Sequence, residues 1–329
     1  MRIGVAYDLK SDYLAQGFSE EDAAEFDSEI TIDAICDALA AQGWQVCRIG
    51  NVKKLIEKLA AGERWDAVFN FCEGLKGVSR EAQVPAILEV YGIPYVFSDA
   101  LTMALTLDKA MTKRVVRDCG VPTPDFAVIE KIEDAAKIDL PFPLFLKPVA
   151  EGSGKGINAK SRVTDADALK STAADLLQKF GQPVLVETFL PGREFTVGIT
   201  GTGPDAEVLG VSEIRQKENY VGHGYGFENK NYWEDKVDIR LAEDEAAEAA
   251  GEVALAAWRA LRCRDGGRID IRNDAHGKPN FIEVNPLAGL RPEYSDMCFI
   301  ARFEGLSYNQ LIGKIMDAFL ARHPELKGK

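Results

Sequence analysis

The sequence predicts an α/β protein that begins with a parallel sheet, and three observations support this prediction. Within residues 1–107, short apolar segments of strand character alternate with longer segments of helical periodicity, a pattern typical of parallel strands joined by helices. After residue 107 this regular alternation ends, and at residues 266–286 two strand-like runs flank a polar loop with Gly and Pro, which indicates an antiparallel pair. The chain has 329 residues, a length that accommodates two or three domains with separate cores.

The first region contains four expected strands and two clear helices. The strands are RIGVAY, WQVCRI, DAVFNF and IPYVF, at residues 2–7, 44–49, 66–71 and 93–97. The helices are DSEITIDAICDALAAQG, which closes on a Gly stop signal, and REAQVPAILEVYG, at residues 27–43 and 80–92. This alternation places the helices on the faces of the sheet.

A helix at residues 102–119 leads through GVPTP into the second region. There the expected strands are PLFLKPV, PVLVETF, FTVGIT and EVLGVSEI, at residues 143–149, 183–189, 195–200 and 207–214. The expected helices beyond residue 119 are residues 165–180, 242–262 and 307–323. A loop rich in Gly, Tyr and Asn occupies residues 218–235.

The composition predicts a soluble protein from a reducing compartment. The net charge of −13 argues against nucleic acid or an anionic membrane as the main partner. The six cysteines form no C-x-x-C pair and no zinc spacing, and the three histidines are dispersed. The N-terminus reaches charged residues too early for a secretory signal, and no apolar run approaches the roughly 20 residues of a membrane span. We therefore expect a cytoplasmic protein.

The segment GGRIDIRNDAHGKPNFIEVNP, residues 266–286, predicts a β-hairpin. In a symmetric register Asp270 lies opposite Glu283, and Arg268 and Asn285 pair on the same face. One interpretation is a solvated hairpin whose charges are spread by neighbouring basic residues. The alternative is a cation between the two carboxylates, which otherwise repel each other. Two carboxylates and an amide oxygen suit Mg²⁺, and the arginine suits a phosphate or a developing oxyanion.

Two segments are candidates for binding a nucleotide. In FLKPVAEGSGKGI, a strand with Lys147 leads into a Gly-rich turn around Ser153, where the backbone can approach phosphate oxygens closely. The turn is not a P-loop, and a plain hairpin is the alternative. In VLVETFLPGREF, Glu187, the linker at Leu190 and Glu194 offer polar groups to a purine and a ribose. A strand–turn–strand with solvated acids is the alternative there.

Two lysine-bearing segments complete the set. LDKAMTK places Lys109 and Lys113 one helical turn apart on the same face. Most such lysines are solvated, but this helix joins the first region to the Gly-rich turn, where a phosphate-seeking lysine is useful. The loop KENYVGHGYGFENKNYWED is too long for a simple connector and is interpreted as a lid that brings Lys230 to the site.

Taken in order, these segments resemble the D-alanine–D-alanine ligases of the ATP-grasp superfamily along nearly the whole chain. The motifs that carry the resemblance are VPAILEVYGIPYVFSDALTMALTLDKAMTK, LKPVAEGSGKGI, VETFLPGREFTV, FENKNYW and RIDIRNDAHGKPNFIEVNPLAG. The resemblance implies an N-terminal parallel-sheet domain followed by the two-lobed ATP-grasp fold. The implied domains are residues 1–107, 108–187 and 188–329, with ATP between the last two.

The resemblance also implies roles for the candidate residues. The residues expected to contact the ATP phosphates are Lys109, Lys147, Ser153 and the lid residue Lys230. Those expected at the adenine, the hinge and the ribose are Glu187, Leu190 and Glu194. The expected ligands of Mg²⁺, or of Mn²⁺, are Asp270, Glu283 and Asn285. The expected catalytic residues are Arg268, Lys230 and Ser153, and those of the amino-acid pocket are Ser153, Gly289 and Ser295.

The implied activity is the ATP- and Mg²⁺-dependent joining of an amino-acid carboxylate to an amine. A carboxylate has a poor leaving group, so phosphoryl transfer from ATP must first convert it to an acyl phosphate, which the amine then attacks. A closing lid keeps water from the acyl phosphate. The expected partners are amino acids and ATP, and a homodimer is expected by analogy alone. The sequence names no general base for the amine.

Several segments differ from the family pattern where the amino acids are expected. VAYDLKSDYLAQGF replaces the usual Gly-Gly turn, and Asp27 or Glu29 is the candidate for a missing acid. Glu73 stands where histidine is common, and Asn231 where an aromatic residue is usual. The acceptor loop reads NPLAGLRPEYSDM, with an additional cation at Arg291. Three alternatives to D-alanine ligation follow: a ligase for other amino acids or amines, a nucleotide-binding regulator without turnover, and a carboxylase-like enzyme that activates bicarbonate.

Overall fold

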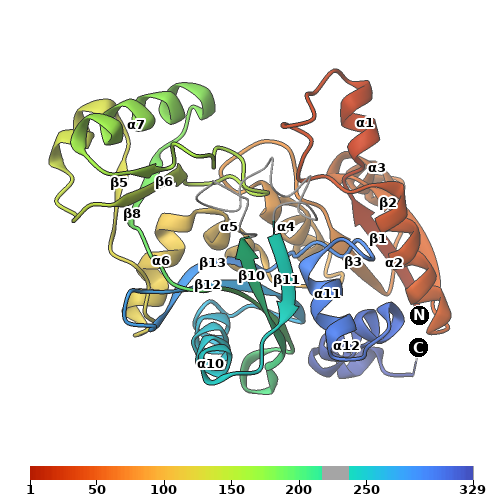
Figure 1. Ribbon diagram of the computed structural model, residues 1–329. Helices are drawn as coiled ribbons and strands as arrows, with labels where there is room; N and C mark the ends of the chain where they lie inside the picture. The colour runs from red at the N-terminus through yellow and green to blue at the C-terminus, as the bar shows by residue number, and fades with distance from the viewer. Residues whose placement is uncertain (217–236, 329) are drawn as a thin grey trace.

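The computed structural model describes residues 1–216 and 237–328 and contains three sheets (Figure 1). The first sheet is parallel, in the order β2-β1-β3-β4. Its strands are β1 Arg2–Tyr7, β2 Gln45–Gly50, β3 Ala67–Phe71 and β4 Tyr95–Val96. The helical elements beside it are α1 Lys10–Ala15, α2 Glu29–Ala41, α3 Val52–Ala60, the 3-10 turn η1 Arg80–Ala82 and α4 Gln83–Val90. The predicted parallel sheet is confirmed.

Apolar side chains cover both faces of this sheet. On one face, Ile3 and Val5 of β1 belong to the same buried cluster as Ile35 of α2. On the other face, Val68 of β3 clusters with Leu55 of α3. The strands are buried on both sides because helices flank a parallel sheet on both faces.

The second sheet is antiparallel, in the order β5-β8-β6-β7. Its strands are β5 Phe126–Ile129, β6 Leu144–Pro148, β7 Arg162–Val163 and β8 Val184–Thr188. The helical elements that cover it are η2 Ile132–Lys137 and α7 Ala166–Phe180 (Figure 1). Asp165 caps α7 by accepting a hydrogen bond from the Ala168 N–H, and Gly181 ends the helix in the left-handed conformation.

The third sheet is antiparallel, in the order β11-β10-β9-β12-β13. Its strands are β9 Glu194–Thr200, β10 Glu207–Gln216, β11 Val237–Leu241, β12 Gly266–Asn273 and β13 Pro279–Asn285. A 3-10 turn, η3 Gly203–Asp205, joins β9 to β10, and α10 Glu245–Ala260 covers one face through small residues and the buried Trp258.

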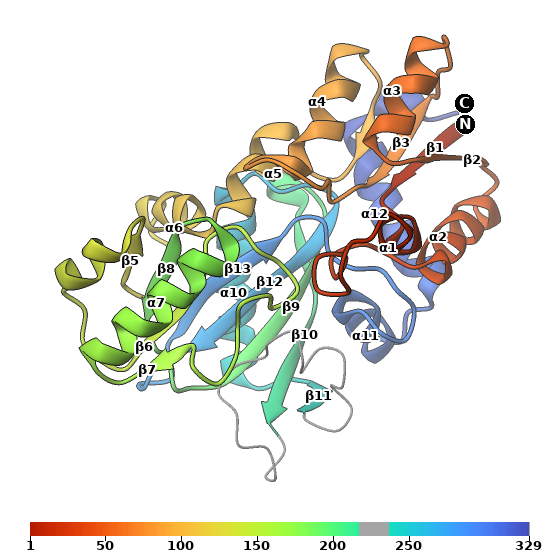
Figure 2. The ribbon, with the colours of Figure 1, turned by 90° about the horizontal axis from the view of Figure 1, so that it is seen from above.

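The last helices attach this sheet to the first one. They are α11 Asp296–Phe303, α12 Tyr308–Arg322 and the 3-10 turn η4 Pro324–Leu326. Ile312 and Ile315 of α12 share a buried cluster with Ile35 of α2 and Ile3 of β1. The two chain ends consequently lie near each other, as Figures 1 and 2 show.

One predicted element is wrong. The single helix expected at residues 102–119 is two helices, α5 Ala100–Leu107 and α6 Lys109–Asp118. Asp108 between them has extended backbone angles (φ −85°, ψ 99°), and its carboxylate accepts a hydrogen bond of 2.9 Å from the Met111 N–H. An aspartate that caps the following turn competes with helix continuation.

Among the helices of the described ranges, none is long and apolar enough to cross a membrane.

Candidate active site

The hairpin β12–β13 has the predicted register. Asp270 lies opposite Glu283 and Arg268 lies opposite Asn285. The register shifts after Asp270, where a bulge inserts Ile282 into β13. The two carboxylates and the arginine therefore line the same wall of the site, as the alternation of side chains requires.

Asp270 and Arg268 hold each other in place. One Asp270 oxygen accepts hydrogen bonds of 2.9 Å from Thr196 Oγ1 and from Arg268 Nη1. The same guanidinium nitrogen lies 3.1 Å from an Asp296 oxygen, at the start of α11. Two flanking acids and a strand position leave the guanidinium little freedom, so it is oriented before any substrate binds.

Two lysines from other elements face Glu283. Lys109 Nζ lies 3.7 Å and Lys147 Nζ 3.9 Å from the same Glu283 oxygen. Lys109 comes from the first turn of α6 and Lys147 from β6. Cations from two sides thus offset the repulsion between the paired acids of the hairpin.

A buried lysine–glutamate–lysine group forms the base of this region. Glu187 of β8 places its oxygens 2.6 Å from Lys113 Nζ and 3.0 Å from Lys147 Nζ. The exposed fractions of the side chains are 5% for Glu187, 0% for Lys113 and 4% for Lys147. Burial lowers the pKa of Lys113 to about 8 against the opposing attraction of Glu187. Burial alone raises the pKa of Glu187, but the two ammonium groups outweigh it and hold this pKa below its ordinary value.

A cleft, here called the interlobe cleft, lies between the second and third sheets and has a volume of about 110 Å³. Its polar lining includes the predicted residues Lys109, Lys147, Glu187, Glu194, Arg268, Asp270 and Glu283. Its apolar walls include Phe145, Ile157, Leu190, Ile214, Ile271 and Ile282. Glu194 forms an ion pair of 3.2 Å with Arg272. A cleft with apolar walls that is also lined by lysines and carboxylates suits an aromatic ring that carries a phosphate chain.

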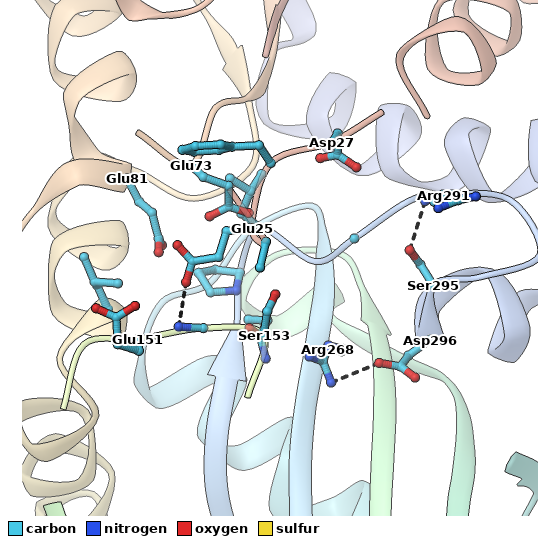
Figure 3. A pocket seen from close by; sticks show the side chains of 18 of the residues that line it. Glu25, Asp27, Glu73, Glu81, Glu151, Ser153, Arg268, Arg291, Ser295 and Asp296 are labelled. Atoms are coloured by element: carbon cyan, nitrogen blue, oxygen red, sulfur yellow. Dashed lines mark hydrogen bonds and ion pairs between the residues drawn. The ribbon is translucent and has the colours of Figure 1, made fainter. Parts of the chain in front are cut away.

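A second cavity, here called the acidic cavity, opens beside the interlobe cleft and has a volume of about 300 Å³ (Figure 3). The two spaces share the lining residues Lys109, Glu151, Arg268 and Glu283. The predicted residues Ser153, Asn285, Gly289 and Ser295 line the acidic cavity. The structure therefore brings the predicted residues of the described ranges together around two adjoining spaces. Lys230 and Asn231 lie outside the described residues, as does the proposed lid.

The segments between β1 and α2 and between β3 and α4 supply four carboxylates to the acidic cavity: Glu25, Asp27, Glu73 and Glu81, the last of them in η1. Glu73 lies two residues after the end of β3. The next residue, Gly74, adopts a φ of +71° and donates its N–H to the Asp8 carboxylate at 2.9 Å. A Cβ on Gly74 would lie 2.5 Å from the Arg80 carbonyl oxygen, so glycine is required there. The turn sets where the Glu73 side chain enters the cavity.

The Glu25 carboxylate is the best anchored of the four. It lies 3.1 Å from Arg80 Nη2 and 3.5 Å from Lys155 Nζ, and it accepts a hydrogen bond of 2.6 Å from the Gly152 N–H. Burial alone raises the pKa of Glu25, but Arg80 and Lys155 outweigh it and hold this pKa below its ordinary value. Glu25 thus connects the first region to the Gly-rich turn. Glu25 is not among the residues predicted from the sequence, because it lies in an acidic run, EEDAAEFDSE, that resembles a solvated surface.

The other three acids are not neutralised in this way. Burial raises the pKa of Asp27 to about 7, although the Thr31 hydroxyl and Arg291 oppose the shift. Burial, followed by repulsion from Glu25, raises the pKa of Glu81 to about 7 against the attraction of Arg80. Burial and the neighbouring acids raise the pKa of Glu73 well above its ordinary value. Perturbed carboxyls in a cavity mark a functional site.

The sequence offers Asp27 or Glu29 as the candidate for the acid that the family pattern has near its N-terminus. Asp27 lines the acidic cavity, whereas Glu29 is exposed and forms an ion pair of 3.1 Å with Arg48. Across the cavity, Ser295 Oγ accepts a hydrogen bond of 3.0 Å from the Arg291 N–H. A Cβ on Gly289 would lie 2.8 Å from this hydroxyl oxygen, so glycine lets the loop pass close to Ser295.

The interlobe cleft lies between the second sheet, which provides Lys147, and the third sheet, which provides Asp270 and Glu283. This arrangement defines the ATP-grasp class of ligases. Residues 115–317, more than half of the chain, match the family model described as the D-ala D-ala ligase C-terminus. A D-alanine–D-alanine ligase of Bordetella petrii is 35% identical over 270 residues, which cover 80% of this chain and 78% of the relative.

A D-alanine–D-alanine ligase of Aquifex aeolicus is 34% identical over 285 residues, which cover 86% of this chain and 92% of the relative. The crystal structure of D-alanine–D-alanine ligase from Bacillus anthracis complexed with ATP has the same fold, with a TM-score of 0.74, 23% identity and 99% of each chain covered. The chain therefore belongs to the D-alanine–D-alanine ligase family, and it is an ATP-dependent carboxylate–amine ligase. The predicted family and fold are confirmed.

Proposed function

We propose that this protein joins the carboxylate of one amino acid to the amino group of another through an acyl phosphate, with Asp270, Glu283 and Asn285 holding Mg²⁺. One observation carries the proposal: the interlobe cleft and the acidic cavity share Lys109, Glu151, Arg268 and Glu283. A triphosphate in the cleft and an amino acid in the cavity then present their reacting groups at the same place, which lowers the barrier by proximity.

ATP is the proposed occupant of the interlobe cleft. Apolar residues such as Phe145, Leu190 and Ile282 offer faces to the adenine. Lys109 and Lys147, which both lie within 4 Å of Glu283, would receive the phosphates. Glu187 holds Lys147 by an ion pair of 3.0 Å, so that the ammonium group is positioned before the nucleotide enters. The D-alanine–D-alanine ligase from Bacillus anthracis, whose structure contains ATP, has the same fold and supports ATP as the nucleotide.

The hairpin residues fit a magnesium ion. Asp270 and Glu283 lie opposite each other, and Asn285 lies one pair further along the same face. The Asn285 amide nitrogen is buried and has no hydrogen-bond partner among the described residues. A flip of the amide exchanges its nitrogen and oxygen, and would place the oxygen at this position for a cation. These are the ligand types that Mg²⁺ accepts. When bound, Mg²⁺ or Mn²⁺ neutralises the charge of the terminal phosphates.

The reaction then has two steps. A carboxylate oxygen of the first amino acid attacks the γ-phosphorus, and ADP leaves. The amine of the second amino acid attacks the carbonyl carbon of the acyl phosphate, and phosphate leaves with the original carboxylate oxygen. Arg268, held by Asp270 and Asp296, donates hydrogen bonds to the transferred group and to the oxyanion of the tetrahedral intermediate.

An ADP-release assay with ATP, Mg²⁺ and pairs of amino acids tests the proposal, with D-alanine as the first substrate. We expect ADP release that depends on amino acids and a product with a new amide bond. If the substrate carboxylate carries ¹⁸O, one labelled oxygen must appear in the released phosphate. Nucleotide binding without amino-acid-dependent ADP would support the regulator instead. The domain limits at residues 1–107, 108–187 and 188–329, the homodimer and the cytoplasmic location stay predictions.

A further inference from the structure

We propose that the acidic cavity selects an amino-acid substrate whose side chain carries a positive charge, an amine or a guanidinium, and that Glu73 and Glu81 recognise this charge. The proposal rests on the proposed function, because it names the substrate class of the same ligase site. The volume of the cavity and its connection to the interlobe cleft define the site. The charges that line it determine what it accepts.

The cavity is large enough for a substrate with a long side chain. Its volume is about 300 Å³, at the lower limit of cavities that enclose small-molecule ligands of roughly 300–1,000 Å³. It extends from the shared residues Arg268 and Glu283 to the loops around Glu25 and Glu73. An amino acid whose carboxylate lies near Arg268 would point its side chain or its amine toward these loops.

Most of the cations that line the cavity already have acidic partners. Lys10 lies 2.7 Å from Glu20, and Lys109 lies 3.7 Å from Glu283. Arg268 lies between Asp270 and Asp296. These positive charges are therefore largely offset within the protein.

Ion pairs within the protein also neutralise the charge of several carboxylates that line the cavity, but not of all of them. Glu25 is paired with Arg80, and Glu151 is 2.5 Å from Lys155. For Glu73 and Glu81, in contrast, the described residues include no ion-pair partner within 4.0 Å and no side-chain hydrogen bond. The cavity thus has a surplus of negative charge.

The arrangement of the charges has two poles. In Figure 3 the carboxylates of Glu25, Glu73 and Glu81 gather on one side of the cavity. Arg268 and Arg291 lie across from them. Of the two amino acids that the proposed reaction joins, the first keeps its ammonium group, for which one acid such as Asp27 is sufficient, and the second attacks as a neutral amine. Two further carboxylates, which have no ion-pair partner within 4.0 Å among the described residues, indicate a second cationic group on the substrate.

Energetic considerations support the same substrate class. Partly buried carboxylates that face each other are costly when charged. A cationic side chain between them replaces this repulsion with charge-assisted hydrogen bonds, whereas an apolar side chain leaves them without a partner. The raised pKa values of Glu73 and Glu81 agree with an unmet demand for positive charge.

The experiment compares cationic and neutral amino acids in the ADP-release assay at pH 8, with the wild-type protein. The cationic set is lysine, ornithine, 2,4-diaminobutyrate and arginine, as both enantiomers. The neutral set is alanine, norleucine and glutamine. We expect kcat/KM for a cationic amino acid to exceed that for norleucine by about tenfold or more, since a hydrogen bond to a charged group contributes that much. A preference for glutamine would indicate protonated carboxyls that bind an amide, and it would overturn the proposal.

Variants then assign the preference to the two acids. In Glu73→Gln and Glu81→Gln we expect the preference for the cationic amino acid to fall by about tenfold, mainly through KM. Glu252→Gln removes the same charge from the exposed face of α10 and serves as the matched control. The dissociation constant for ATP reports whether each variant is folded. Equal losses for cationic and neutral substrates would contradict recognition of the charge.

The outcomes separate the two proposals. If neutral amino acids support ADP release as well as cationic ones do, the ligase function stands and the substrate class is wrong. If no amino acid supports ADP release although ATP binds, the ligase function and the substrate class both fail. Because the comparison of substrates needs only the wild-type protein, it decides the question even where a variant does not fold.

Discussion

The buried group of Lys113, Glu187 and Lys147 allows a quantitative prediction. In Glu187→Gln, two ammonium groups that lie 2.6 and 3.0 Å from the glutamate lose their common counter-charge. The glutamine amide has one acceptor oxygen, and its NH₂ group faces the other ammonium group. Removing one partner of a buried ion pair costs about 3–5 kcal/mol. With an unfolding entropy of about 2.1 cal/mol/K per residue, this loss lowers Tm by roughly 4–7 °C for a chain of this length.

The matched variants are Lys113→Met and the double variant with Glu187→Gln. Lys113→Met removes the fully buried ammonium group and leaves Glu187 paired with Lys147. In the double variant the glutamine oxygen accepts from Lys147, and the methionine needs no partner. We therefore expect the double variant to be no less stable than Glu187→Gln alone. Its loss of unfolding free energy should then be about 2 kcal/mol smaller than the sum of the two single losses.

Urea unfolding of the four proteins, followed by far-UV circular dichroism, measures this coupling. Glu194→Gln is the control, because Glu194 is 26% exposed and has one ion-pair partner, Arg272. Its loss should be below about 1 kcal/mol. If the loss of unfolding free energy in the double variant equals the sum of the two single losses, Lys113 and Lys147 do not share Glu187 as a counter-charge, and the reasoning is refuted.

Three further predictions concern the site. Asp270→Asn should raise the Mg²⁺ concentration needed for half-maximal ADP release by about 10–100-fold, which a metal titration measures; an unchanged requirement would place the metal elsewhere. Glu81 faces Arg80, Glu25 and Lys109, and its pKa is raised to about 7. Protonated Glu81 therefore stabilises the folded protein, fully below about pH 4, and this contribution is lost as the pH rises through about 7. Glu81→Gln should therefore stabilise the ligand-free protein at pH 8 by roughly 2–3 kcal/mol but not at pH 4, as urea unfolding at both values would show. Gly152→Ala places a Cβ 2.6 Å from a Glu25 oxygen, so it should raise KM for the amino acid by roughly tenfold while the ATP affinity stays within about twofold.

The sequence predicts the hairpin well because its information is local. Strand alternation and a polar turn are enough to place Asp270 opposite Glu283, and the structure has this pairing. The strands of the parallel sheet are predicted for the same reason. The bulge at Ile282 leaves no comparable trace, since one additional residue in a strand does not change its apolar pattern.

Elements whose signals are short or mixed were not predicted. Strands β5 and β7 have four and two residues, too few for a periodic pattern. The break between α5 and α6 depends on one capping side chain, Asp108, within a segment of otherwise helical character. Local propensity does not decide such cases, because tertiary contacts outweigh it.

The candidate site shows where sequence reasoning ends. Lys113 resembles a solvated lysine beside Lys109, yet it is fully buried against Glu187 and donates hydrogen bonds to Thr123 and to the Phe281 carbonyl oxygen. Glu25 and Glu81 resemble surface acids, because their burial arises only when loops distant in the chain meet. Burial of a charged group depends on the whole fold, and no local pattern reports it.

The loops that bear Glu25, Asp27, Glu73 and Glu81 all belong to the first 81 residues, whereas Arg268, Asp270 and Glu283 belong to one hairpin near the other end of the chain. If the proposed roles hold, mutations in the former alter which molecule enters without disturbing the groups proposed to handle phosphate. Such a separation allows descendants of one ancestor to acquire new substrates by changing a few turns. An exchange of these loops between relatives, with the hairpin untouched, is therefore a practical route to redesigned ligases.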